Sequence, residues 1–465
     1  SAVHTSLHYD QAGCQEDAYR AGMQAATEVE KVYAYETASE YLELSARNAP
    51  SPGALAEVRV RMAELAETIG RYDDAEELCD LAIEWFVGQG NRQRALTLRR
   101  MRVLARKELG EHAKVTLDSL KELDEEAKAL GSLRERAEII TLLSQVHGRI
   151  GENKKSEELA AECVALAEQL GDDALLAGAL NRLAITVEPD SPLRARTFYE
   201  RALDLYQRIG DVRGQARCHS NLGIAMHMEA MYDEAKKHLA IAISLARAAG
   251  MADLSGTASM NLGVMTQQMG DRERARELFS DALGLFAAVK NSELQLYALF
   301  NLANLDRETK QYESGAALYE ACASLARRIG NVDLELGSIA GEGVCYLEMG
   351  NIEAARVPYA VLEERLASDT WFQNRELAEA LRVRLAAAEG KMDEALRLFD
   401  VALATVERIN EPYSLASLAA FCAETIYPIA PERIDRLVAR YPHEMGVIGI
   451  EAILKKVREP QNAAQ

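Results

Sequence analysis

A glycine followed five positions later by a small residue recurs about every forty residues of this chain. The pair is complete at Gly70/Ala75, Gly270/Ala275, Gly350/Ala355 and Gly390/Ala395. Other residues hold the same register at Gly110/Val115, Gly151/Ser156, Asp190/Ala195, Ala230/Ala235 and Lys310/Gly315. A period in this range is typical of solenoids built from stacked helical hairpins. Because such a stack forms a long surface more readily than a catalytic pocket, the period favours binding over catalysis.

One repeat, residues 211–250, shows how each period is expected to fold. Asp211 can cap a first helix that ends near Met228, and a tight turn leads into a second helix over about 233–248. Gly250 then closes the repeat in the left-handed conformation. The alanines after the turns are expected where the two helices cross, since a larger side chain would push the pair apart. We attribute both the glycines and the alanines of the period to packing.

The pattern divides the chain into three parts and predicts an all-α solenoid of antiparallel helical hairpins. Residues 1–50 form irregular N-terminal hairpins, 51–410 the repeat array, and 411–465 capping helices with a tail. The first limit follows from the Pro50–Gly53 segment, which predicts a break, and the second from the loss of the pattern after Asn410. Prolines at 428, 431 and 442 are expected to separate three tail helices, the last ending near Val457.

Composition excludes several classes of function. The formal net charge is −20, whereas sequence-independent nucleic-acid binding requires clustered Lys and Arg, so we expect no direct nucleic-acid partner. The seven cysteines include no C-x-x-C pair, which argues against a disulfide or metal framework and favours a reducing, cytoplasmic compartment. No apolar run approaches the roughly eighteen residues that span a bilayer, so no membrane insertion is expected.

The sharpest candidate for function is a series of asparagines, each nine residues before a turn position of the period. They are Asn181, Asn221, Asn261 and Asn301. Asparagine is a poor helix former, so four in register need a cause. Because an amide both donates and accepts, it can bind a peptide unit of any sequence. The alternative is that these side chains bond neighbouring helices to each other and stiffen the stack.

Helical geometry places further residues on the same face as the asparagines. Candidate ligand contacts among them are Arg217, His227, Gln268, Tyr297, Asn304 and Arg307. The two arginines could hold a carboxylate or phosphate, although plain solvated surface is the alternative for any single residue. His219 and His227 are too far apart for one metal on one helix. No nucleotide-binding, zinc-protease or hydrolase motif is present, so we expect no catalysis, cofactor or metal.

The repeat residues resemble the tetratricopeptide repeat across about 50–410. The positions that match are Asn221-Leu222-Gly223, Ala230, Tyr232, Ala235 and Ala242, and Asn261-Leu262-Gly263, Gly270, Ala275 and Ala282. The period is longer than the family's usual thirty-four residues, and the family's proline after the second helix is missing. The long repeats are similar to those of kinesin light chains and of bacterial signal-transduction ATPases. The resemblance implies a right-handed superhelix whose concave face carries the asparagines.

The expected function is therefore protein or peptide binding in the concave groove, as an adaptor or scaffold without enzymatic activity. The alternative is a regulatory sensor arm that binds a small molecule or a partner protein and controls an ATPase, kinase or transcription regulator. Residues 8–45 resemble the segment that opens the repeat region of bacterial ATPase-linked and kinase-linked regulators. That resemblance implies an attached or separate nucleotide-binding regulator as a second kind of partner.

Overall fold

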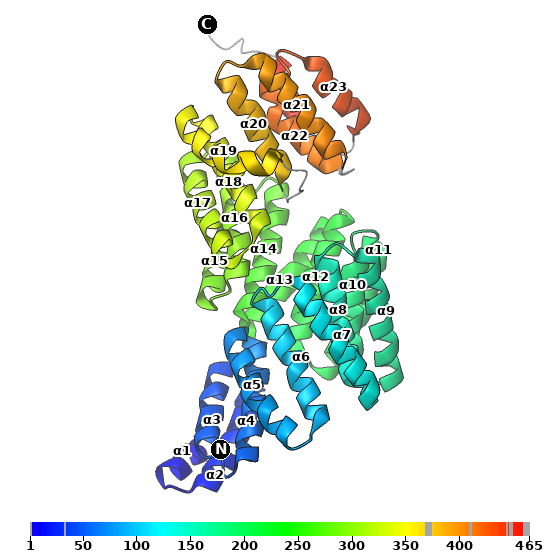
Figure 1. Ribbon diagram of the computed structural model, residues 1–465, viewed down its shortest axis with the longest axis vertical. Coiled ribbons are helices and arrows are strands. Elements are labelled where there is room, and N and C mark those ends of the chain that lie inside the picture. The colour runs from blue at the N-terminus through cyan, green and yellow to red at the C-terminus, as the bar shows by residue number, and fades with distance from the viewer. Residues whose placement is uncertain are drawn as a thin grey trace. The chain divides into compact units, whose positions relative to one another are not determined.

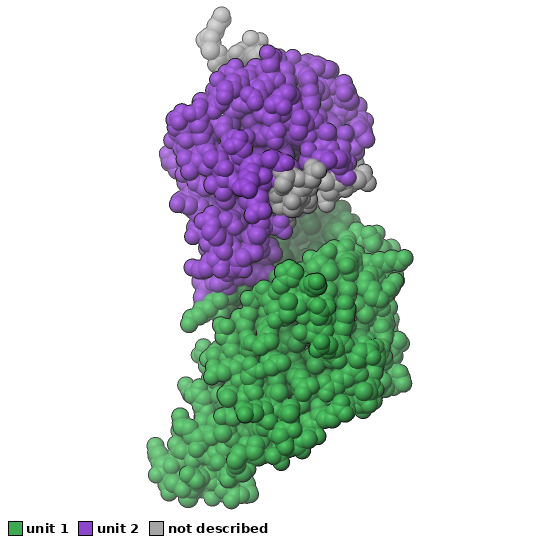
Figure 2. All heavy atoms as spheres, viewed as in Figure 1, with its two compact units in different colours: residues 1–265, 288–291 green, residues 266–287, 292–465 purple. Residues whose placement is uncertain are grey.

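The computed structural model describes residues 2–31, 34–367, 374–408, 412–442, 445 and 450–458. Within these residues the regular structure consists of twenty-four α-helices and no β-strand, and consecutive helices form antiparallel hairpins (Figure 1). This confirms the predicted all-α hairpin solenoid. The chain forms two compact units, coloured separately in Figure 2. Unit 1 comprises 1–265 and 288–291, and unit 2 comprises 266–287 and 292–465.

Unit 1 contains the N-terminal hairpins and the first repeats. Its helices are α1 Ala2–Gln11, α2 Gln15–Glu30, α3 Tyr35–Arg47, α4 Pro52–Ile69, α5 Tyr72–Gly88, α6 Arg92–Glu108, α7 Ala113–Leu130, α8 Leu133–Arg149, α9 Asn153–Leu170, α10 Asp173–Val187, α11 Pro192–Ile209, α12 Val212–Met228 and α13 Tyr232–Ala248. The limit between the units then falls within α14 Ala252–Gln268 and α15 Arg272–Ala288.

Unit 2 contains the later repeats and the tail. Its helices are α16 Ser292–Glu308, α17 Tyr312–Ile329, α18 Val332–Glu348, α19 Ile352–Ala367, α20 Arg375–Ala388, α21 Met392–Glu407, α22 Pro412–Ile426, α23 Pro431–Arg440 and α25 Ile450–Arg458. The predicted tail helices correspond to α22, α23 and α25, which ends one residue beyond Val457. Asn410 lies outside the described residues, and the predicted domain limits at 50 and 410 stay predictions.

The repeat over 211–250 folds as its sequence predicts. The Asp211 carboxylate accepts a 2.9 Å hydrogen bond from the backbone nitrogen of Gly214, which caps α12. The helix ends at Met228, and Gly250 has a φ of +66°. A similar cap begins α4, where the Ser51 hydroxyl accepts from the nitrogen of Ala54.

Packing explains the alanines of the period but not its turn glycines. Ala75, Ala235, Ala275, Ala355 and Ala395 are at most 2% exposed, as expected for a helix crossing. The turn glycines instead have positive φ, and a Cβ built on any of them meets nothing within 4 Å. Their cause is therefore the left-handed backbone, which glycine adopts without a steric cost. Ala230, Lys290 and Lys310 adopt the same backbone at φ values of 60°, 55° and 62°.

The repeat that follows Gly110 corrects the predicted register. Val115 is 51% exposed, whereas its neighbour Thr116 is fully buried. The helix α7 begins at Ala113, three residues after its glycine, but α5 begins only two residues after Gly70. One extra residue in this turn moves the buried position from Val115 to Thr116.

The core consists of several hydrophobic clusters, and some of them join helices of successive hairpins. In unit 1, for example, Tyr199 of α11 packs in one cluster with Leu222 of α12 and Leu239 of α13. Unit 1 also contains a contact between distant repeats. Arg213 at the start of α12 donates a 3.0 Å hydrogen bond to the backbone carbonyl of Thr68 near the end of α4. The array of unit 1 thus curves enough to join segments 145 residues apart.

Candidate binding surface

The predicted asparagine ladder occupies the first helices of successive hairpins. In unit 1, Asn181 lies on α10, Asn221 on α12 and Asn261 on α14. Asn181 is buried, with 6% exposure, whereas the other two are half-buried. Asn301 lies on α16 of unit 2 and is also half-buried. The four positions therefore share a register but differ in their access to solvent.

Hydrogen bonds link Asn221 and Asn261 to the first helix of the preceding hairpin. The Nδ2 atom of Asn221 donates to Oδ1 of Asn181 at 3.1 Å, and the Cys218 thiol donates to the same oxygen at 3.4 Å. The Nδ2 atom of Asn261 donates to the Ser220 hydroxyl at 3.2 Å. Such bonds are expected if the asparagines join neighbouring helices and stiffen the stack. At buried Asn181 this structural role explains why an asparagine occupies the position.

The half-buried asparagines keep hydrogen-bonding capacity. An asparagine side chain carries two N–H donors and a carbonyl oxygen with two acceptor positions. Asn221 and Asn261 each use one donor, and neither Oδ1 accepts a hydrogen bond from a described residue. The side chain of Asn301 makes no hydrogen bond with the described part of the chain. A fixed amide with a vacant carbonyl oxygen can pair with a ligand N–H group.

The other unit 1 candidates are positioned by aromatic neighbours. Arg217 is exposed on α12 and contacts the hydroxyl of Tyr206. Burial raises the pKa of Tyr206 to about 12, and the nearby guanidinium opposes that rise. The ring of His227 packs against Tyr232 with their centroids 5.5 Å apart. Arg217 is thus the exposed cation on the face of Asn221.

The unit 2 candidates Asn304 and Arg307 are joined through a tyrosine that sequence reasoning missed. Arg307 Nε donates to the Tyr319 hydroxyl at 3.2 Å, and that hydroxyl donates to Oδ1 of Asn304 at 2.6 Å. Burial raises the pKa of Tyr319 to about 12, so the hydroxyl keeps its proton at neutral pH. The Arg307 guanidinium also lies over the Phe421 ring, 5.2 Å from its centroid.

This network limits what Arg307 can do. Its guanidinium is already engaged by a hydroxyl and an aromatic face, so a bound anion would have to share these contacts.

The remaining candidates, Tyr297 on α16 and Gln268 at the end of α14, are exposed. The repeat register could have indicated Tyr319. It lies nine positions after the turn residue Lys310, just as Tyr199 lies nine positions after the turn residue Asp190.

The most basic helix, α6, is not an open anion site. Arg100 pairs with Glu135 of α8 at 3.0 Å, Arg102 with Asp80 of α5 at 2.6 Å, and Arg106 with Glu76 of α5 at 2.7 Å. Its arginines therefore join neighbouring hairpins.

The described residues contain no group of three or more His, Cys, Asp or Glu side chains that could hold a metal ion. None of the helices in the described ranges is long and apolar enough to cross a membrane.

The stacked hairpins, with buried alanines at their crossings and amides on their first helices, define a helical-repeat fold of the tetratricopeptide type. No family model matches the sequence, and no curated protein matches it either. A Rap protein complexed with Competence and Sporulation Factor is similar in structure, with a TM-score of 0.52 and 14% identity, over 84% of this chain and 99% of that one.

A signal-transduction ATPase with numerous domains and a tetratricopeptide repeat sensor, PH0952 from Pyrococcus horikoshii, is also similar. Its TM-score is 0.54 and its identity 16%, over 82% of this chain. The match spans 54% of that protein's length. At these identities the likenesses establish the fold.

Proposed function

We propose that this chain is a protein- or peptide-binding module that holds an extended segment of its partner against the first helices of the hairpins, as an adaptor or scaffold. The observation that carries the proposal is the pair Asn221 and Asn261. Each is half-buried, each is oriented by one hydrogen bond to the preceding first helix, and neither carbonyl oxygen accepts a hydrogen bond from a described residue. Because binding requires no reacting group, the proposed module acts without catalysis. Its proposed compartment is the cytoplasm.

The spacing of the hairpins suits an extended ligand. Packed helices lie about 8–10 Å apart, and an extended chain rises about 3.3 Å per residue. Asparagines on adjacent first helices would therefore meet about every third peptide unit of the ligand. Amide contacts of this kind favour an extended backbone without selecting its sequence, and Arg217 beside the ladder would favour an acidic side chain. The Rap protein of similar fold was solved in complex with a factor that it binds, which supports a binding role for such an array.

A peptide selection tests the proposal. Peptides would be selected from a random library on the full chain, and their dissociation constants measured by fluorescence anisotropy. We expect the Asn221→Ala/Asn261→Ala variant to bind selected peptides roughly tenfold or more weakly, because two peptide contacts are lost. Exposed Asn153 on α9 provides the matched control, and Asn153→Ala should bind like the wild type. N-methylation of the contacted ligand amides should weaken binding to the wild type only. Equal affinity of the double variant, confirmed folded by circular dichroism, contradicts the amide mechanism.

A second candidate function is a regulatory sensor arm for a nucleotide-binding regulator. The likeness to PH0952, a signal-transduction ATPase with a tetratricopeptide repeat sensor, favours it. The reading frame upstream of residue 1 tests this candidate directly. A P-loop ATPase encoded there, with a hydrolysis rate that changes when the repeat array is removed, would support the sensor arm. An upstream frame without such a module, and no ATPase that binds the array, would leave the adaptor role.

A further inference from the structure

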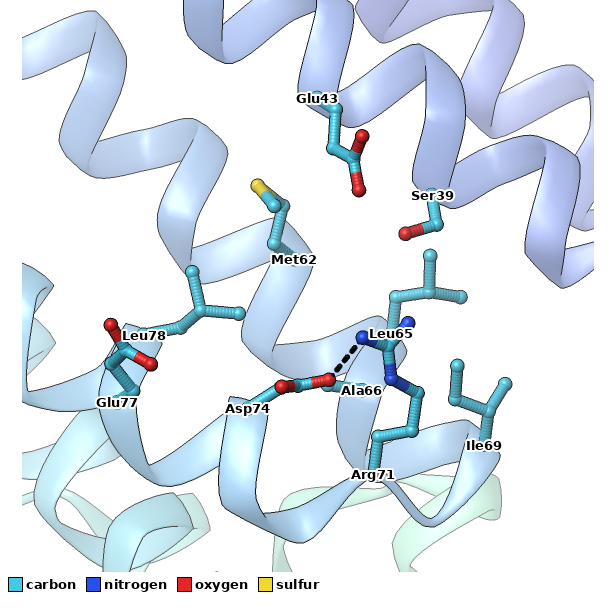
Figure 3. Close-up of a pocket in the computed structure, with 10 residues that line it drawn as sticks. All are labelled: Ser39, Glu43, Met62, Leu65, Ala66, Ile69, Arg71, Asp74, Glu77 and Leu78. Atoms are coloured by element: carbon cyan, nitrogen blue, oxygen red, sulfur yellow. Dashed lines mark ion pairs between the residues drawn. The ribbon is translucent and has the colours of Figure 1, made fainter. Parts of the chain in front are cut away.

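A pocket of about 200 Å³ lies among α3, α4 and α5 of unit 1 (Figure 3). Its apolar wall comes from α4, where Met62, Leu65 and Ala66 share one helix face. Glu43 from α3 and Glu77 from α5 border it on either side. The pocket thus combines an apolar wall with carboxylates at its edge, and it is separate from the asparagine ladder.

The pocket carries uncompensated negative charge. Arg71 forms an ion pair with Asp74, so this cation and this carboxylate neutralise each other. Glu43 and Glu77 are exposed, and neither forms an ion pair with any residue that the structure describes. Two carboxylates therefore remain for a cation from outside the chain.

The following repeat shows what fills the equivalent space. Shifting the register from Gly70 to Gly110 places Arg102 at the position of Met62 and Arg106 at the position of Ala66. The Arg102 guanidinium lies 2.6 Å from the Asp80 carboxylate, and the Arg106 guanidinium 2.7 Å from that of Glu76. Both ion pairs join α6 to the preceding second helix, α5.

The preceding second helices can be aligned in the same way. Ala38 of α3 and Ala75 of α5 are each the first buried residue of their helix, with 0% and 2% exposure. Five positions after each of them stands a carboxylate, Glu43 and Asp80 respectively. Glu43 therefore keeps the acidic half of the ion pair, while Met62 replaces its basic half. The pocket is the space that an arginine side chain occupies one repeat later.

We propose that this pocket binds an arginine side chain of a partner polypeptide. The guanidinium would pair bidentately with Glu43, with Glu77 contributing the second negative charge, and the aliphatic stem would lie on Met62 and Leu65. A planar guanidinium fits a carboxylate in two hydrogen bonds, whereas an ammonium is a point charge, so arginine is preferred to lysine. The site is a second contact point, independent of any ligand on the asparagines.

The Met62 methyl group provides a local probe of this pocket in the full chain. We would label methionine methyls with ¹³C, assign Met62 through Met62→Leu, and titrate N-acetyl-arginine amide. The expected result is a saturable shift of the Met62 methyl signal, with no comparable shift for neutral N-acetyl-citrulline amide. An equal response to both compounds, or no response of Met62 to the arginine compound, overturns the proposal.

Charge and filling variants complete the test with a labelled pentapeptide containing one arginine, measured by anisotropy. Glu43→Gln should weaken binding roughly fivefold, the effect of one partly exposed ion pair. Glu36→Gln is the matched control, because Glu36 is exposed on the same helix but does not line the pocket. Met62→Arg should pair with Glu43, fill the pocket and abolish binding. Unchanged binding in both Glu43→Gln and Met62→Arg, with thermal melts showing folded protein, also overturns the proposal.

Discussion

The side-chain amide of Asn221 donates a 3.1 Å hydrogen bond to the side-chain carbonyl oxygen of Asn181, its counterpart forty positions earlier. The two residues share a register but have different environments, since Asn181 is buried and Asn221 is half-buried. Asn181 therefore has a structural role between the helices, whereas Asn221 keeps a carbonyl oxygen that accepts no hydrogen bond from a described residue. Because of this difference, replacing a buried and a half-buried asparagine should have different effects on stability.

Replacement of the buried asparagine should destabilise the protein more than replacement of an open one. Asn181→Ala removes an acceptor used by both Asn221 and Cys218, so we expect the free energy of unfolding to fall by about 1–2 kcal/mol. Asn301→Ala breaks no hydrogen bond to a described residue and should change it by about 0.5 kcal/mol or less. Urea unfolding followed by circular dichroism measures both. Equal losses would contradict the division of roles.

The non-glycine residues in left-handed turns should be replaceable with a gain in stability. Lys310 has a φ of 62°, which costs a residue with a Cβ about 1–2 kcal/mol. Glycine removes this cost but loses more entropy on folding, so Lys310→Gly should gain about 0.5–1 kcal/mol. The reverse change Gly270→Ala, at a φ of 90°, should lose a similar amount or more. Melting temperatures that move in the same direction for both variants would refute the backbone explanation.

Stability should fall in mild acid because of two facing histidines. The Nδ1 atoms of His219 and His238 lie 2.9 Å apart. Burial lowers the pKa of His219 to about 4, with His238 adding to the effect, and burial also lowers the pKa of His238, although Glu200 opposes this. A folded pKa below the unfolded value of about 6.5 means that the unfolded chain binds more protons between these values. The stability from this pair is therefore complete above pH 6.5 and is lost as the pH falls toward 4.

We expect His219 alone to reduce the free energy of unfolding by about 2 kcal/mol between pH 7.5 and pH 5. Urea unfolding at the two pH values gives the difference directly. In the double variant His219→Gln/His238→Gln, the difference in the free energy of unfolding between the two pH values should be about 2 kcal/mol smaller than in the wild type. If wild type and double variant depend on pH to the same extent, the pair is not responsible.

A buried ion pair at the start of α20 predicts a large single-variant effect. Arg375 and Glu379 are 2% and 1% exposed and lie 3.3 Å apart, and Arg375 also donates to the Leu366 carbonyl. Arg375→Met leaves Glu379 buried with Arg382 as its one ion-pair partner among the described residues, so we expect a loss of about 3 kcal/mol. The double variant Arg375→Met/Glu379→Met should recover much of this loss. Thermal unfolding that gives equal losses would show that the uncompensated carboxylate is not the cause.

Local structure followed closely from sequence wherever one residue determines it. Asp211 predicted the start of α12 because a carboxylate caps free backbone N–H groups regardless of the surroundings. The period alone could not reveal the inserted residue after Gly110, because Val115 and Thr116 both suit a helix crossing. The cause of the glycines was also ambiguous, since a small residue satisfies a packing limit and a left-handed backbone equally well.

The contacts of the candidate site depended on partners that spacing could not identify. Their positions on the helix predict that Asn304 and Arg307 face a ligand, but the Tyr319 hydroxyl on α17 forms hydrogen bonds with both. The contact of Arg307 with Phe421 joins residues more than a hundred positions apart and depends on the curvature of unit 2. Similarly, the pocket beside Glu43 became apparent only when its lining was compared with the ion pairs of α6.

The hydrogen bonds of the asparagine ladder give the array a direction. Each amide of Asn221 and Asn261 donates toward the hairpin that precedes it in the chain. A version of the protein that starts at Asp211 would therefore leave the Asn221 donor without its acceptor, whereas one that stops at Gly250 would break no donor bond within the retained ladder. The array should thus tolerate loss of hairpins from its C-terminal side better than from its N-terminal side, and recombined arrays should keep each asparagine hairpin with its predecessor.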